Sequence, residues 1–212
     1  FLINMLDGFD VLVMAFTAAS VPSEWGLSGI QLGYLLSAGL IGMALGSLFI
    51  APWADRFGRR PLILLCISIA RMGMLTSSQA SSVTALGALR LLTGSGIGGV
   101  LASSYVIAGE YANKKWRSLV ISLQSTAYAL GATIGGVIAA QIIPHMGWRS
   151  VFLYGGVVTL MALPIMYFLL PESIAYLVAR QPHNALNRLN RLLSRVGIDQ
   201  FNAMPKGELG SP

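Results

Sequence analysis

The sequence has 212 residues, of which 55% are hydrophobic and 10% are charged, and its formal net charge is +6. A soluble domain usually carries about 25% charged residues, so a water-soluble protein of this length is not expected. The basic residues are not gathered on one face with aromatic residues between them, and we therefore expect no nucleic-acid partner.

Long apolar segments follow one another along the chain, at roughly 1–21, 30–51, 61–79, 83–109, 118–142 and 150–170. Each can cross the ~30 Å hydrocarbon core of a bilayer as a helix of ~20 residues. The segments lack the period of two that a membrane barrel requires. The sequence therefore predicts an all-α membrane fold, with a six-transmembrane-helix bundle over 1–171. Because Phe1 already lies inside an apolar segment, we expect that the natural N-terminus is missing.

Polar residues of the first segment share one side of the predicted helix. Asn4, Asp7 and Asp10 are spaced three apart, which places them on the same helix face. A carboxylate at the bilayer centre costs roughly 2.5–3.5 kcal/mol, so two of them indicate a polar cavity or a partner. Burial and mutual repulsion would favour proton uptake by one of these acids. The alternative is that this segment is a helix end whose acids reach water.

Positive charges occur inside the third and fourth segments. Arg71 lies near the middle of the third, and the sequence does not indicate its partner. Arg90 lies seven residues into the fourth, about 10 Å below the outer surface, at a depth similar to that of Asp10. We expect a direct or water-linked pair between Arg90 and Asp10, in which Arg90 could also hold an anionic substrate. Alternatively, Arg90 extends to the interface and binds nothing.

Lysine and arginine residues divide sharply between the two sides of the predicted bundle. Eleven lie in the loops after the second and fourth segments and in the C-terminal region, whereas Arg149 is the only one in the other loops. By the positive-inside rule, the chain ends and the basic loops are cytoplasmic, in a bacterial-type inner (plasma) membrane. The lipid bilayer is then an expected partner. Glu110, at the end of the fourth segment, is expected either to meet the basic residues at the cytoplasmic face or to be a solvated helix end.

Glycines are spaced for close helix packing within several segments. Small residues four apart allow helix backbones to approach closely in lipid. Three pairs have this spacing, namely Gly42 and Gly46, Gly94 and Gly98, and Gly131 and Gly135. The run Gly94–Gly99 also fits G-x-G-x-x-G, but it lies within a long apolar segment rather than between a strand and a helix, so no dinucleotide is expected.

The C-terminal region 172–212 is more polar and predicts a cytoplasmic linker. Residues 184–195 are typical of a basic amphipathic helix on the membrane surface. His145 and His183 have no neighbours suited to a metal site. No paired nucleophile and base is found, so we expect no catalytic residues, no metal, no cofactor and no enzyme activity.

The segment 51–60 carries the first family resemblance. It reads Ala-Pro-Trp-Ala-Asp-Arg-Phe-Gly-Arg-Arg and resembles the loop signature G-x-x-x-D-R-x-G-R-R of the major facilitator superfamily, with Ala51 in place of the first glycine. Further segments resemble signatures of the aromatic acid:proton symporter family: Asp7-Gly8-Phe9-Asp10, Arg90-Leu-Leu-Thr-Gly-Ser-Gly96, Glu110-Tyr111 and Pro171-Glu172-Ser173. DGFD is usually followed by Thr, and here Val11 follows it.

The resemblance implies the N-terminal half of a twelve-helix fold, with a missing C-terminal six-helix half as partner. It implies proton coupling by Asp7 and Asp10, and binding of a small organic anion by Arg90, Asp10 and the neighbouring Asn4. A conformational gate is expected from the loop signature together with one acid, namely Asp55, Arg56, Gly58, Arg59, Arg60 and Glu110.

The function predicted on this basis is a proton-coupled symporter for small organic anions, most of all aromatic carboxylic acids. A sugar, dicarboxylate or drug carrier of the same superfamily is the alternative, because fold does not fix substrate. A second hypothesis, from another functional class, is a six-helix membrane partner or fragment that does not transport. An intramembrane enzyme is the third hypothesis.

Overall fold

The computed structural model describes residues 1–181 and 185–196, and the regular structure in these residues is entirely helical. The shorter helices are α2 (Ser20–Trp25), α4 (Ala54–Phe57), α9 (Ile174–Arg180) and α10 (Ala185–Val196). The longer ones are α1 (Leu2–Phe16), α3 (Gly29–Leu45), α5 (Arg59–Ser77), α6 (Val83–Tyr111), α7 (Arg117–Met146) and α8 (Trp148–Leu169). A π-helical turn, Gly46–Ile50, and a 3-10 turn, Ala51–Trp53, join α3 to α4.

Five stretches of helix in the described residues are long and apolar enough to span a membrane: Gly29–Phe57, Arg59–Ser77, Val83–Tyr111, Arg117–Met146 and Trp148–Leu169. They coincide with the second to sixth predicted segments. The first predicted segment is divided, because α1 ends at Phe16 and a turn precedes α2. With 15 residues, α1 is about 22 Å long and shorter than the hydrocarbon core.

Helix ends are fixed by local side chains and by glycines. Ser28 and Gln31 form a capping box at the start of α3, and the Ser82 hydroxyl accepts a bond from the Ala85 N–H at the start of α6. Gly147 alone separates α7 from α8, at a φ of 75° that most residues avoid. These features set where each long helix begins.

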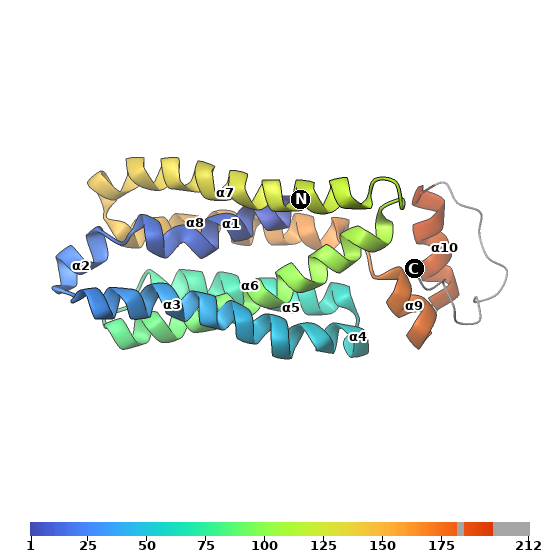
Figure 1. Cartoon of the computed structure of the whole chain (residues 1–212), viewed down its shortest axis with the longest axis horizontal. Coiled ribbons are helices and arrows are strands. Elements are labelled where there is room, and N and C mark those ends of the chain that lie inside the picture. The colour runs from blue at the N-terminus through green and yellow to red at the C-terminus, as the bar shows by residue number, and fades with distance from the viewer. Residues whose placement is uncertain (182–184, 197–212) are drawn as a thin grey trace.

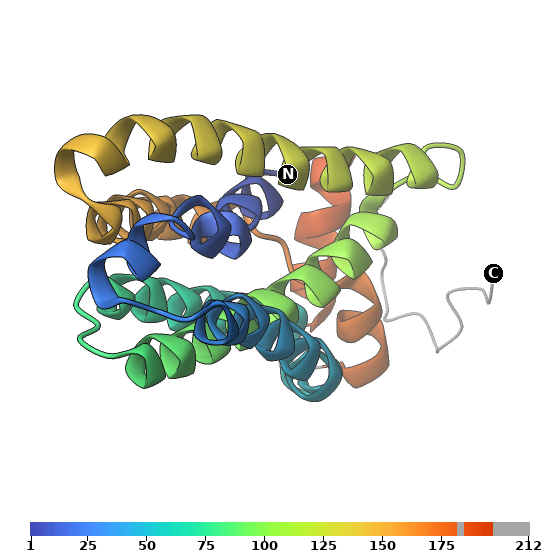
Figure 2. The same cartoon turned by 60° about the vertical axis from the view of Figure 1, so that its left-hand side comes forward.

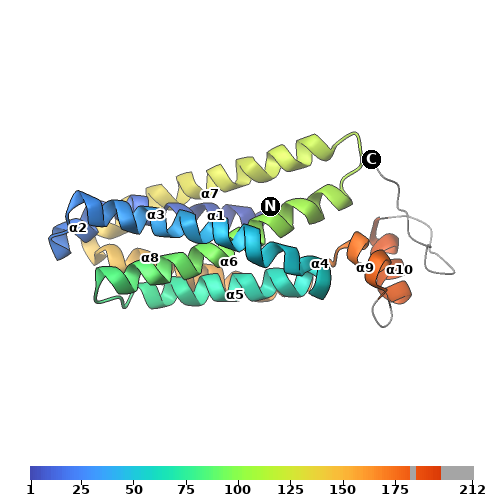
Figure 3. The ribbon, with the colours of Figure 1, turned by 60° about the horizontal axis from the view of Figure 1, so that its bottom comes forward.

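The long helices form two groups that run along the same axis (Figure 1). One group contains α1, α7 and α8, and the other contains α3, α5 and α6. α1 packs on α7, α3 packs on α6, and α5 packs on both α6 and α8. Figure 2 shows the two groups from another side, with α7 covering α1 and α8. In Figure 3, α2 lies at one end of the bundle, whereas α9 and α10 lie beyond the other.

Backbones approach closely at the predicted glycine pairs. A methyl group on Gly42, Gly46, Gly94 or Gly98 would overlap backbone atoms across the α3–α6 contact. A methyl group on Gly131 would overlap the Met5 carbonyl, and one on Gly135 would overlap the Phe9 ring. All three pairs therefore lie in helix contacts, as the small-residue spacing predicts.

Two apolar layers fill the bundle at different heights. The layer toward α2 contains Val13, Met74, Trp148 and Phe152, all buried. The layer toward α9 contains Ile63, Cys66, Ile67 and Val100 among its buried residues. On α5, Arg71 lies between Ile67 of one layer and Met74 of the other. Arg71 thus lies between two apolar layers, near the middle of the bundle.

The α2 end of the bundle is tied by one acidic residue. Glu24 forms an ion pair with Arg149, and Trp148 Nε1 donates a hydrogen bond of 2.6 Å to Glu24 Oε2. Arg149 also lies 4.4 Å from the centre of the Trp148 ring and donates to the Ala80 carbonyl oxygen at 3.4 Å. These contacts join α2, the turn before α6 and the start of α8.

The predicted amphipathic helix corresponds to α10, and Asn184, at its expected start, lies outside the described residues. Leu189 is buried and packs with Val178 and Ile174 of α9. Part of the apolar face of α10 is therefore covered by α9. His183 and the segment 197–212 also lie outside the described residues, and a position on the membrane surface stays a prediction.

Candidate functional site

The centre of the site is a buried arginine between two acids. Asp7 and Asp10 of α1 are each 1% exposed, and Arg71 of α5 is fully buried. Arg71 Nη2 donates to Asp7 Oδ1 at 3.2 Å, and Arg71 Nη1 is paired with Asp10 Oδ2. The structure thereby supplies the partner of Arg71 that the sequence does not indicate. Paired in this way, the charges can exist in a low-dielectric interior.

Arg90 of α6 is 3% exposed and does not extend to the surface. Its Nη2 donates to Ser77 Oγ at 3.0 Å and to Thr93 Oγ1 at 3.4 Å, and its guanidinium carbon lies 4.8 Å from the centre of the Phe152 ring. Among the residues that the structure describes, Arg90 forms no ion pair. The expected direct pair with Asp10 is therefore not formed, because neutral groups of α5, α6 and α8 hold the guanidinium.

A small cavity nevertheless connects Asp10 with Arg90. Its walls come from α1, α3 and α6, and they include Asp10, Arg90, Thr93 and Gly39. The volume of about 20 Å³ is enough for about one water molecule. Asp10 and Arg90 thus line the same space, and the structure is compatible with a water-linked pair between them.

Asn4 extends the polar side of α1 toward the α9 end. It is fully buried, and its Oδ1 accepts a hydrogen bond of 3.1 Å from Ser104 Oγ of α6. Gln124 Nε2 of α7 donates to the Ser104 carbonyl oxygen at 3.5 Å. Asn4, Asp7 and Asp10 therefore share a buried face, as their spacing predicts.

Several buried polar atoms at this centre have no hydrogen-bond partner in the described part of the chain. They include Asn4 Nδ2, Asp7 Oδ2, Asp10 Oδ1 and Arg90 Nε. Buried polar atoms are almost always paired in proteins, by protein groups or by water. Two of these atoms belong to Asp10 and Arg90, which line the small cavity, and unpaired polar atoms beside a cavity are typical of a place that binds protons, water or polar ligands.

A larger cavity of about 240 Å³ lies among α1, α7 and α8. Its walls include Phe9, Ile134, Ile138 and Val158, and no charged residue is among the described residues that line it. A carboxylate would lose its hydration there without gaining a partner. The small cavity beside Asp10 and Arg90 is therefore the better candidate for ion binding.

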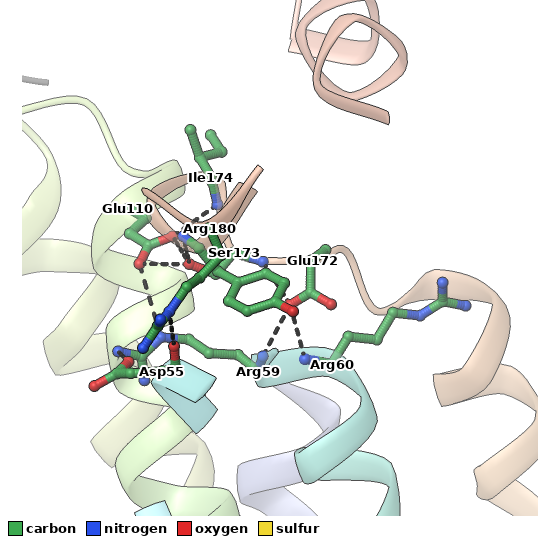
Figure 4. Close-up of polar contacts among 9 residues, drawn as sticks. Asp55, Arg59, Arg60, Glu110, Glu172, Ser173, Ile174 and Arg180 are labelled. Carbon is green, nitrogen blue, oxygen red and sulfur yellow. Dashed lines mark hydrogen bonds and ion pairs between the residues drawn. The ribbon is translucent and has the colours of Figure 1, made fainter. Parts of the chain in front are cut away.

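A second polar cluster ties the loop-signature segment 51–60 to α6 and α9 (Figure 4). Arg59 Nη2 donates to Asp55 Oδ1 at 2.8 Å, and Arg59 Nε lies 3.9 Å from Glu110 Oε1. Glu110 accepts from Ser173 Oγ at 2.8 Å and from the Ile174 N–H at 3.0 Å. The predicted gate residues Asp55, Arg59 and Glu110 are therefore in one cluster.

The other predicted gate residues have different surroundings. Arg60 Nη2 donates to the Tyr167 carbonyl oxygen at 2.6 Å, and its guanidinium carbon lies 5.1 Å from the centre of the Tyr167 ring. Gly58 has a φ of 100° and ends α4 immediately before α5. Arg56 is exposed on α4. The signature thus combines ion-pairing residues with a glycine that allows a sharp change of direction.

Glu172 is the functional candidate that sequence reasoning missed. Its Oε1 accepts bonds from the N–H groups of Arg59 (2.9 Å), Arg60 (3.0 Å) and Ser173 (3.0 Å). It supplies negative charge to the N-terminus of α5, where the helix dipole favours an anion. The only signal in the sequence was the Pro171-Glu172-Ser173 resemblance, which does not say what Glu172 contacts.

The model of the Major Facilitator Superfamily matches residues 1–198 of the chain. The chain belongs to the major facilitator superfamily. Similar curated proteins include a gallate transporter of Pseudomonas putida, 42% identical over 181 residues, which are 85% of this chain and 40% of the relative. A 4-hydroxybenzoate transporter of Pseudomonas aeruginosa is 37% identical over 200 residues, which are 94% of this chain and 44% of the relative.

Solved structures of the superfamily share the fold of this chain. The proton:xylose symporter XylE, bound to 6-bromo-6-deoxy-D-glucose, matches with a TM-score of 0.77 at 21% identity, over 92% of this chain and 49% of XylE. The chain spans about half the length of the relatives that it matches. It is a multi-pass membrane protein related to aromatic acid transporters, in a family of transporters rather than enzymes, as the sequence predicts.

Proposed function

We propose that the chain forms the N-terminal half of a proton-coupled symporter for small organic anions, with aromatic carboxylic acids as the substrate class. The observation that carries the proposal is the buried acid Asp10 and the buried base Arg90 on the walls of one cavity. The names of the relatives, which include gallate and 4-hydroxybenzoate transporters, support an aromatic carboxylate.

The two charges give a simple coupling mechanism. When Asp10 is ionised, its negative charge in the shared cavity opposes the entry of a second anion. A proton on Asp10 removes that charge and leaves Arg90, now held by Ser77, Thr93 and Phe152, as the strongest anion-binding group. A guanidinium binds a carboxylate through two parallel hydrogen bonds, and Asn4 would add a donor through its unpaired Nδ2.

The remaining walls of the substrate site would come from a second six-helix half. Superfamily transporters bind substrate between two halves near the middle of the membrane. In this proposal, the small organic anion and the proton enter between the halves, and the C-terminal half supplies the groups that select one acid.

The cluster around Asp55, Arg59 and Glu110 acts as the cytoplasmic gate in this proposal. Its contacts join the end of α4, the start of α5, the end of α6 and the start of α9. Such ion pairs can break and reform when one half rocks against the other. The bundle 1–171 lies in the inner membrane, and the linker from 172 onward and both chain ends are cytoplasmic.

Uptake of radiolabelled 4-hydroxybenzoate by proteoliposomes that contain the full-length transporter tests the function. An inward proton gradient should stimulate uptake, and Asp10→Asn and Arg90→Ala should abolish the stimulated component. Lys115→Ala removes an exposed charge of the α6–α7 loop and serves as a control with unchanged uptake. Normal gradient-driven uptake by both site variants would refute the assigned roles.

A further inference from the structure

Arg71 has no role in the mechanism proposed above, although it is the best-buried charge of the bundle. It is fully buried and contacts both acids of α1. It lies between the two apolar layers, so water does not stabilise its charge from either side. A buried arginine that only filled space would be costly, and its position between two titratable groups indicates a functional reason.

Negative charges outnumber positive charges in the cluster of Asp7, Asp10 and Arg71. Two carboxylates, Asp7 and Asp10, face one guanidinium, Arg71, so the ionised cluster has a net charge of −1. In a low-dielectric interior a cluster with no net charge is strongly favoured. One proton makes this cluster neutral, whereas a second would leave a net positive charge. The cluster is therefore built to take up one proton.

Two other ionisable groups near the acids are neutral and do not change the net charge of the cluster, and Arg90 forms an ion pair with neither acid in the described part of the chain. Cys66 of α5 and Tyr128 of α7 are close enough to interact with the Asp7 charge, and both are neutral in their ordinary protonated forms. Arg90 of α6 faces Asp10 across the small cavity. The residues that α3 contributes to this cavity are apolar or glycine, among them Leu35, Gly39 and Met43. In the cavity, Arg90 is then the positive charge left for a substrate anion.

The two acids differ in how a proton can reach them. Asp10 lines the small cavity, and Asp7 does not. A proton that arrives through water in the cavity forms an O–H bond with the Asp10 carboxylate, and the same bond breaks when the proton leaves toward the cytoplasm. Asp7 keeps its hydrogen bond from Arg71 throughout, because Asp7 does not line the cavity through which the proton arrives.

We propose that Arg71 sets the proton stoichiometry of transport, by remaining the ion-pair partner of Asp7 and leaving Asp10 as the one acid that exchanges a proton. This inference rests on the proposed function. It assigns Arg71 as a positioning residue that acts through the two acids and does not touch the substrate.

Charge-balanced variants of the full-length transporter test this role with 4-hydroxybenzoate as the probe. The readouts are the number of protons taken up per molecule of probe and the ratio of uptake with and without an inward proton gradient. Wild type should take up about one proton per probe molecule and show gradient stimulation of about fivefold or more. Asp7→Asn pairs Arg71 with Asp10 alone and makes the cluster neutral, so gradient stimulation should be lost.

The double variant Asp7→Asn/Arg71→Gln restores the original imbalance, since Asp10 is then a single acid without a cation. Its gradient stimulation should return to within about twofold of wild type, even if its absolute rate is lower. Arg71→Gln alone leaves two acids without a cation and should raise the proton ratio toward about two. Arg71→Lys keeps the charge and should keep the ratio.

The outcomes separate this inference from the proposed function. Absence of gradient stimulation in wild type would refute symport itself. With wild type coupled, a double variant as uncoupled as Asp7→Asn would overturn the role of Arg71, as would an unchanged proton ratio in Arg71→Gln. The comparison of Asp7→Asn with the double variant is decisive even if Arg71→Gln does not fold.

Discussion

Glu24 is the residue whose electrostatics can be tested outside the membrane-spanning helices. The pKa of its carboxyl is lowered from the ordinary value, first by the hydrogen bond from Arg149 and further by the bond from Trp148. A carboxyl with a lowered pKa in the folded state stabilises the fold above its unfolded pKa of about 4.3. This contribution is lost as the pH falls through the folded pKa.

We expect the melting temperature of the detergent-solubilised transporter to fall more steeply below about pH 4.5 in wild type than in Glu24→Gln. Glutamine keeps an acceptor for the Trp148 N–H but carries no charge, so it isolates the ionic part of the contact. The check is a series of thermal unfolding curves between pH 7 and pH 3. Parallel acid profiles for the two proteins would contradict this account of Glu24.

Individual buried charges were predictable from the sequence to different degrees. The acids Asp7 and Asp10 share a face because helical spacing places residues three apart together. The partner of Arg71 was not predictable, since α5 and α1 are separated by more than 40 residues of sequence and only packing brings them together. Arg90 was expected beside Asp10, but Ser77, Thr93 and Phe152 hold it instead.

At the scale of the helices, the α1–α7 contact depends on missing side chains. Gly8 faces the Tyr128 carbonyl, and Gly131 faces the Met5 carbonyl. The backbone of each helix can therefore approach the other where a side chain is missing. This contact places the acids of α1, because α1 has only 15 residues and packs along α7.

Gly131→Ala should lower the free energy of unfolding by about 1–3 kcal/mol, because the added methyl group pushes α1 away from α7. Gly33→Ala on α3 is the matched control: nothing lies within 4 Å of its added methyl group. That control should be unchanged or slightly more stable, given the higher helix propensity of alanine. Denaturant unfolding of both variants in mild detergent provides the measurement, and equal stabilities would disprove the close contact.

For the whole molecule, the distribution of positive charge predicts orientation in the membrane. The α5–α6 turn and the α6–α7 loop lie at opposite ends of α6, and only the loop carries lysines, Lys114 and Lys115. We therefore expect the α6–α7 loop on the cytoplasmic side of the membrane and the α5–α6 turn on the outer side.

Single cysteines at Ser81 and Lys115 test this orientation, since both positions are exposed. A membrane-impermeant thiol reagent added to intact cells should label Ser81→Cys and leave Lys115→Cys unlabelled until the cells are opened. The native Cys66 is buried and provides the background. Labelling of Lys115→Cys in intact cells would reverse the assigned topology.

The sequence by itself determined the class of fold, the positions of the long helices and the glycine contacts. Each depends on local composition or on spacing within one helix, as in Gly94 and Gly98 or in Asn4, Asp7 and Asp10. Tertiary structure decided which charges meet, because those contacts cross between helices distant in sequence. Arg71 between the acids of α1, and Glu172 on the first N–H groups of α5, exist only once the bundle has packed.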